Sequence, residues 1–196
     1  MEKNLTIEFK LLIGEEHISV DDCLKNPKKL LDYYLSEEDA TDSSFQGGYC
    51  ISVNGKKWNA IAGEFYFDMF SYSLNWLKGI EILLSKDQTE ENVGFWEESN
   101  AKAILKESNT LEIIDKTVNG KILGESVSID FENFCSLMLS ESKKYESLAL
   151  LVKARIMDAS KHIDKEKGIQ VIREMCGDDF LKHNKAIESL MGKYFA

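Results

Sequence analysis

The sequence predicts an α+β domain in which a mostly antiparallel sheet packs against two long helices. Two Asn-Gly pairs, Asn54-Gly55 and Asn119-Gly120, each stand between alternating apolar residues, which is a strong short-range signal for a β-hairpin. Apolar residues at helical spacing then run from 131 to 157, directly behind the second hairpin. Hairpins that lead into a long amphipathic helix are typical of the α+β class.

The N-terminal third predicts a strand, a helix and a loop. Residues 4–13 are rich in branched apolar side chains and predict a strand that ends at Gly14. Asn26-Pro27 predicts a helix start, because the first helical position does not need the N–H that proline lacks. Residues 36–48 are acidic and small, which is typical of a loop before the first hairpin.

The middle of the chain predicts a buried helix and further strands. Residues 65–84 can begin as strand, but their apolar positions recur at helical spacing and cover almost all sides, so we expect a central helix. A second polar loop is expected at 86–94. Four strands are expected after it, at 95–98, 102–106, 110–118 and 121–129. Gly124 marks a candidate bulge in the last of them.

The long helix is expected to begin after Asp130, a good N-cap, and to lie across the sheet. Its apolar stripe consists of Phe131, Cys135, Met138, Tyr145, Ala149, Val152 and Ile156. Lys143, Lys144 and Lys153 should then face solvent or the helix flank, so Lys144→Asp is expected to be close to neutral for stability. Short helices should follow in the tail, the last of them capped by Asp178.

The length of 196 residues suits one domain, 1–196, with a sheet-and-helix body at 1–160 and a C-terminal helical segment at 161–196. The chain has no apolar run of membrane-spanning length and no signal peptide. Its four cysteines are far apart, which predicts reduced thiols in a cytoplasmic protein.

The net charge of −10 is uneven along the chain. Residues 1–160 carry 17 basic and 28 acidic side chains, whereas the tail is close to neutral. Such a body repels nucleic acid and steers a basic protein partner toward itself. The candidate partner-binding residues are the carboxylates of the two expected loops, Glu37, Glu38, Asp39, Asp42, Glu90 and Glu91.

No sequence motif predicts a catalytic residue, a cofactor or a metal site. Cys176 and His183 are close enough in sequence to form a nucleophile–base pair, but Gly177 separates them and no third group orients the histidine. A core cysteine and a surface histidine are the simpler interpretation. The paired carboxylates lack the spacing of a calcium loop, and neither Asn-Gly turn opens a phosphate-binding helix.

The aromatic run FYFDMFSYSLNWLKGIEILL and the hairpin-to-helix stretch IDFENFCSLMLSE resemble segments of bacterial immunity proteins of polymorphic toxin systems. The resemblance covers residues 48–157 at the level of pattern, and it carries no functional residue over. It implies a non-catalytic inhibitor that covers the active site of a toxin, and a basic toxin domain would suit the acidic body.

The leading expectation is therefore an acidic, protein-binding domain without membrane contact. Two alternatives from other classes stay open. One is an enzyme whose site is assembled from dispersed residues. The other is a structural or regulatory dimer built on the 131–157 helix, so the chain is expected to be a monomer or a homodimer.

Overall fold

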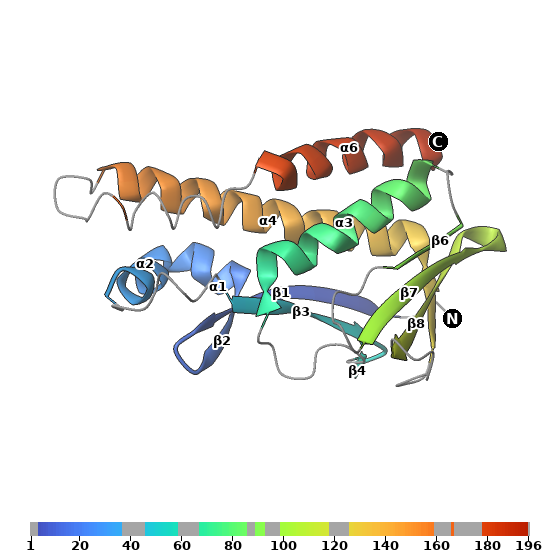
Figure 1. The fold of residues 1–196 in the computed structure, drawn as a ribbon, viewed down its shortest axis with the longest axis horizontal. Helices are drawn as coiled ribbons and strands as arrows, with labels where there is room; N and C mark the ends of the chain where they lie inside the picture. The colour runs from blue at the N-terminus through green and yellow to red at the C-terminus, as the bar shows by residue number, and fades with distance from the viewer. Residues whose placement is uncertain are drawn as a thin grey trace.

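The computed structural model describes residues 4–36, 46–58, 67–85, 89–92, 99–117, 126–158, 166 and 178–195. These residues form antiparallel sheets and helices, which confirms the α+β class (Figure 1). The strands are β1 (Leu5–Ile13), β2 (Glu16–Ser19), β3 (Gln46–Val53), β4 (Lys56–Trp58), β5 (Phe67–Asp68), β6 (Glu90–Asn92), β7 (Ser99–Lys106), β8 (Thr110–Thr117) and β9 (Val127–Asp130). The helices are α1 (Val20–Lys25), α2 (Pro27–Ser36), α3 (Met69–Ser85), the 3₁₀ turn η1 (Glu107–Asn109), α4 (Phe131–Asp158) and α6 (Asp178–Tyr194).

The first sheet has the strand order β2-β1-β3-β4, and β5 also pairs with β3. In β1 every second residue, from Leu5 to Ile13, is buried, and the residues between them are exposed or half-buried. Two predicted turns are confirmed. Gly14 has a φ of +66°, and the β3–β4 turn places Asn54 and Gly55 at φ values of 54° and 78°, the left-handed pair that a type I′ turn requires.

The second sheet has the order β6-β7-β8-β9, so the two predicted hairpins belong to two sheets and not to one. The turn expected at Asn119-Gly120 lies outside the described residues. A two-residue turn there, without a bulge, would place Ile113 opposite Ser126. The register pairs Ile113 with Val127 instead. This register differs by one residue from that of a two-residue turn, and Gly124, the candidate bulge, lies outside the described residues.

Helix α4 confirms the predicted junction and the predicted stripe. The Asn133 N–H donates to Asp130 Oδ1 at 2.8 Å, so Asp130 caps the helix. Met138, Tyr145 and Val152 are buried inside the chain. These three residues of the predicted stripe are therefore part of the core, and the side chain of Ile156 lies outside the described part of the structure.

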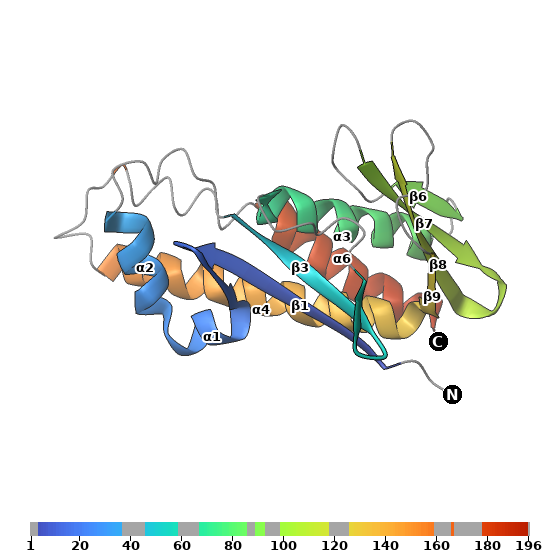
Figure 2. The same cartoon turned by 90° about the horizontal axis from the view of Figure 1, so that it is seen from below.

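The helices form layers above the first sheet (Figure 1). Helix α4 packs on β1 and α3 packs on β3, α3 and α4 touch each other, and α6 lies on the side of α3 and α4 away from that sheet. The second sheet stands at the end of the molecule where α4 begins (Figure 2). This arrangement explains why α3 is apolar almost all round: a sheet lies on one side and α6 on the other.

One helix was not predicted. The branched residues Ile18 and Val20 favour a continuation of the N-terminal strand after a break at Gly14, but Val20 begins α1. The signal was present in the sequence, because Ser19 stands three residues before Asp22. The Ser19 hydroxyl accepts the Asp22 N–H at 3.1 Å and caps the helix. Helix α2 then begins at Pro27 as predicted.

Candidate functional site

The candidate partner-binding carboxylates fall in two places. Glu37, Glu38, Asp39 and Asp42 lie outside the described residues, but they follow Ser36, the last residue of α2, without a break in the chain. Glu90 and Glu91 are in strand β6, where they pair with Ile104 and Ala103 of β7. The loop predicted at 86–94 is therefore wrong at these two residues. Ladder hydrogen bonds to β7 override the polar composition of the segment.

The Glu90 carboxylate is also neutralised within the chain. Lys102 Nζ lies 2.6 Å from Glu90 Oε1, across the β6–β7 pair. A carboxylate that is already paired with a lysine binds a basic protein less favourably, because the incoming lysine or arginine must displace the ammonium group that is already in contact. The other predicted carboxylates, at 37–42 directly after α2, are therefore the better candidates for the binding surface.

The β1–β2 turn and α2 together present an acidic face, which we define as Glu15, Glu16 and Asp32. All three residues are exposed. The turn packs on α2 at Gly14, where an added Cβ would lie 3.8 Å from Tyr33 Cε2. Glu16 Oε2 accepts from Lys29 Nζ at 2.7 Å, and this hydrogen bond lowers the pKa of the Glu16 carboxyl.

Two members of the acidic face remain unpaired. Glu15 stands next to Gly14 in the turn, and Asp32 lies one helical turn beyond Lys29 on α2. Neither carboxylate has an ion-pair partner among the residues that the structure describes. Because Glu37 follows Ser36 directly, the four carboxylates of 37–42 continue the chain from this face. The face is thus the described surface that best fits the predicted acidic loop.

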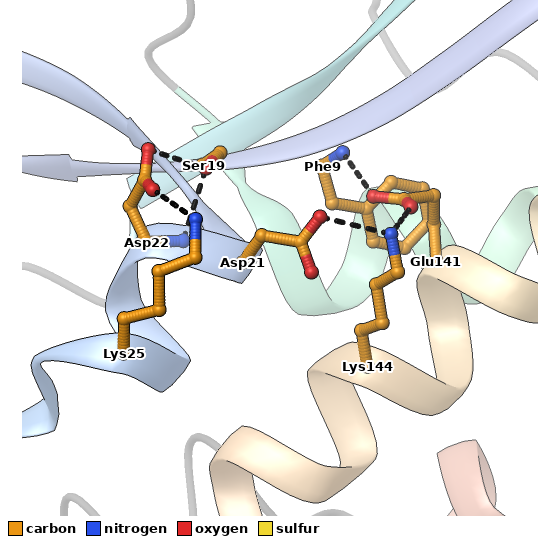
Figure 3. Close-up of polar contacts among 7 residues, drawn as sticks. All are labelled: Phe9, Ser19, Asp21, Asp22, Lys25, Glu141 and Lys144. Atoms are coloured by element: carbon orange, nitrogen blue, oxygen red, sulfur yellow. Dashed lines mark hydrogen bonds and ion pairs between the residues drawn. The ribbon is translucent and has the colours of Figure 1, made fainter.

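Helix α4 carries a buried carboxylate, Glu141, that was not predicted (Figure 3). Glu141 of α4 accepts the backbone N–H of Phe9 at 3.0 Å and a hydrogen bond from Lys144 Nζ at 2.5 Å. Lys144 also reaches Asp21 of α1, at 3.0 Å. Strand β2 pairs with β1 only from Lys10 to Ile13, so Glu141 takes the N–H that the missing strand would have accepted.

The sequence did contain a signal for this cluster. The stripe of α4 has an apolar residue at every three or four positions except between Met138 and Tyr145, where Glu141 and Ser142 stand instead. Both polar residues are buried. Polar residues inside a buried stripe need partners, and the sequence pattern gives their position but not the partners.

Ser142 and its neighbours hold α6 on α4. The Ser142 hydroxyl donates to Asn184 Oδ1, and Asn184 Nδ2 donates to Glu146 Oε2 at 3.0 Å. Asn184 is buried. On the surface, Lys143 pairs with Glu188 at 2.7 Å. These contacts favour one register of α6 along α4, because a shift of α6 along the helix would separate the hydrogen-bonded groups and leave buried polar atoms without partners.

His183 is not the surface histidine that the sequence predicted. It is half-buried, and its Nδ1 contacts Glu81 Oε2 of α3. A carboxylate that orients a histidine is one half of a nucleophilic site. However, Cys176 lies outside the described residues, and within them no serine or cysteine hydrogen-bonds to this pair. The contact serves to join α3 to α6.

The thiols agree with the prediction where they are described. Cys23, Cys50 and Cys135 are free and buried, and Cys176 lies outside the described residues. Burial raises the pKa of Cys23 to about 11 and raises that of Cys135 as well. Buried thiols with a raised pKa are poor nucleophiles at neutral pH, so Cys23 and Cys135 do not suggest covalent chemistry.

Within the described part of the chain, no His, Cys, Asp and Glu side chains gather as a metal site would require. None of the described helices is long and apolar enough to cross a membrane. No family model, no curated protein and no solved structure matches this chain.

Proposed function

We propose that this protein is a non-catalytic, protein-binding domain of the cytoplasm that neutralises a basic partner by covering its active site. The proposal takes its biological setting from the resemblance to immunity proteins of polymorphic toxin systems. Its physical support comes from charge. A chain of net charge −10 attracts a basic protein over long range and opposes nucleic acid.

The observation that carries the proposal is the pattern of unpaired carboxylates. Among the described residues, Asp22, Glu90 and Glu188 each pair with a lysine, whereas Glu107 and Glu132 do not. Within the same residues, Glu15 and Asp32 of the acidic face have no ion-pair partner, and the acidic segment 37–42 follows α2 directly in the chain. Unpaired, exposed carboxylates beside an acidic segment are what an encounter with lysine and arginine side chains uses.

The first step of the test identifies the partner. The tagged protein is incubated with extract of its source organism, and proteins that co-elute in fixed stoichiometry are identified by mass spectrometry. The proposal requires a basic protein whose own activity falls when the purified complex forms. If the bound protein is acidic, or keeps full activity in a saturated complex, the proposed function is wrong.

The second step locates the surface with two variants of equal charge change. Glu15→Lys with Asp32→Lys alters the acidic face. Glu107→Lys with Glu132→Lys alters two exposed carboxylates near the β7–β8 turn and the start of α4, at the other end of the molecule (Figure 1). The face variant should slow association about tenfold and weaken its dependence on salt, whereas the control should change it much less. Equal effects would mean that net charge matters and this face does not.

A further inference from the structure

Residues 20–36 form a short arm, the α1–α2 arm, that carries Asp32 of the acidic face. The C-cap Asn26 joins its two helices, and the Asn26 N–H donates to the Asp22 carbonyl oxygen at 3.0 Å. The arm packs on the body through buried Val20, Cys23 and Leu30. Apolar contacts of this kind hold the arm on the body but do not set its direction, because the hydrophobic effect is not directional.

Two directional contacts join the arm to the body. One is the Lys29–Glu16 ion pair between α2 and the β1–β2 turn, and the other is the row of polar groups in Figure 3, which reaches α1. The row starts at the Phe9 N–H, passes through Glu141 and Lys144 of α4, and ends at Asp21 in the first turn of α1. The Glu141 side chain is 8% exposed, whereas Lys144 is 34% and Asp21 53% exposed. The inner link is therefore fixed in the core, and the outer link can open to water.

We propose that the Lys144–Asp21 contact is a latch that holds the α1–α2 arm in one orientation on α4, with Glu141 as its fixed anchor. Lys144 Nζ lies between two carboxylates that come from different elements, so both contacts form together only when α1 is seated. When the outer link opens, Lys144 keeps Glu141 as a partner and no buried charge is left alone. Opening is thus cheap for α4 and frees only the arm.

The latch bears on partner binding, because the acidic face depends on where the arm lies against the β1–β2 turn. That consequence rests on the proposed function. The latch itself does not, and it is tested on the free protein. A protein without the latch that still binds its partner would contradict only the link between the two proposals. A protein with the latch that binds no basic partner would contradict only the proposed function.

The experiment is a double-mutant cycle read by amide hydrogen exchange with mass spectrometry. Asp21→Asn removes the outer link alone. Lys144→Gln removes the outer link and also takes the cation from Glu141, and the double variant removes nothing further from the outer link. Asp21→Asn should speed exchange in peptides covering 20–36 about fivefold, which is the size expected for a half-exposed ion pair, and Lys144→Gln should speed it at least as much. The double variant should be no faster than the quicker single variant, since the two residues act through one contact.

A matched control breaks the ion pair of Lys143, the lysine beside Lys144 on α4. Glu188→Gln breaks the Lys143–Glu188 pair, which is of similar exposure but leads to α6. It should leave exchange in 20–36 unchanged. The latch is refuted if the Asp21 and Lys144 effects on exchange in 20–36 multiply, if Asp21→Asn raises exchange equally across the whole chain, or if Glu188→Gln speeds exchange in 20–36 as much as Asp21→Asn does.

Discussion

Glu141 illustrates what one residue does when it breaks a pattern. A carboxylate in the middle of a buried stripe would be costly alone, so its position requires donors. The chain supplies them from β1 and from the same helix, through the Phe9 N–H and Lys144. Lys144 is therefore not the neutral surface residue that its helical position predicted.

At the residue scale we expect Lys144→Asp to destabilise the protein by about 2–3 kcal/mol, because it leaves Glu141 without a cation and adds a second carboxylate beside it. The expected loss of stability is small for the breaking of a buried ion pair, because Lys144 is one-third exposed. Val152→Asp should cost more, as it places an unpaired carboxylate in the core. Urea unfolding at equal protein concentration measures both. A Lys144→Asp midpoint equal to that of the parent would contradict the ionic contacts.

The thiols give a second prediction at this scale. Cys23, Cys50 and Cys135 are buried, so they should not react with a thiol reagent in the folded protein at pH 7. In denaturant without reductant, all four cysteines of the chain should titrate. Two or fewer would mean a disulfide and would contradict the expected reducing compartment.

At the scale of elements, local chemistry decided where helices and turns begin. Pro27 starts α2, Asp130 caps α4, and Asn54-Gly55 closes the β3–β4 hairpin. Asn54 also holds the N-terminal end of β1. Its N–H donates to the Asn4 carbonyl oxygen at 2.7 Å, and its Oδ1 accepts the Asn4 N–H at 2.9 Å. Strand β6 shows the opposite case, where pairing with β7 overrode a loop-like composition.

Two glycines give a matched test of this local chemistry. Gly55 has a φ of +78°, so Gly55→Ala should cost about 1–2 kcal/mol although nothing lies within 4 Å of the added Cβ. Gly192 lies in α6 with equally open space and no positive φ, so Gly192→Ala should stabilise by about 0.5–1 kcal/mol. Thermal unfolding of both variants checks the signs. A stable Gly55→Ala would contradict the type I′ turn.

At the scale of the whole molecule, many lysine–carboxylate pairs lie on the surface. The Lys25–Asp22 and Lys106–Glu112 hydrogen bonds lower the pKa of Asp22 and Glu112, and hydrogen bonds to Asp22 and Glu141 raise the pKa of Lys25 and Lys144, respectively. Each exposed pair contributes little, so their effect is best seen in how stability changes with pH.

We expect the free energy of unfolding to be greatest near neutral pH and to fall on both sides. A carboxyl whose folded pKa is lowered stabilises the protein above its unfolded value, so that part is lost as pH falls below about 4. The raised pKa of Cys23 acts in the opposite direction, so stability should also fall above pH 9, the ordinary value for the thiol, and the raised pKa values of Lys25 and Lys144 add to this loss above pH 10.5. Urea midpoints at pH 3, 7 and 10.5 test this. A flat profile would contradict the ion pairs.

The sequence by itself determined the class of the fold and most element starts, because caps, turn residues and apolar periodicity act over a few neighbouring residues. It also placed the acidic segment 37–42, directly after α2. Only the tertiary structure decided that the two hairpins lie in different sheets, that Glu90 pairs with Lys102, and that Glu141 meets Phe9. These are contacts between residues far apart in the chain, and which of many possible partners a strand edge or a buried charge meets depends on how the whole core packs.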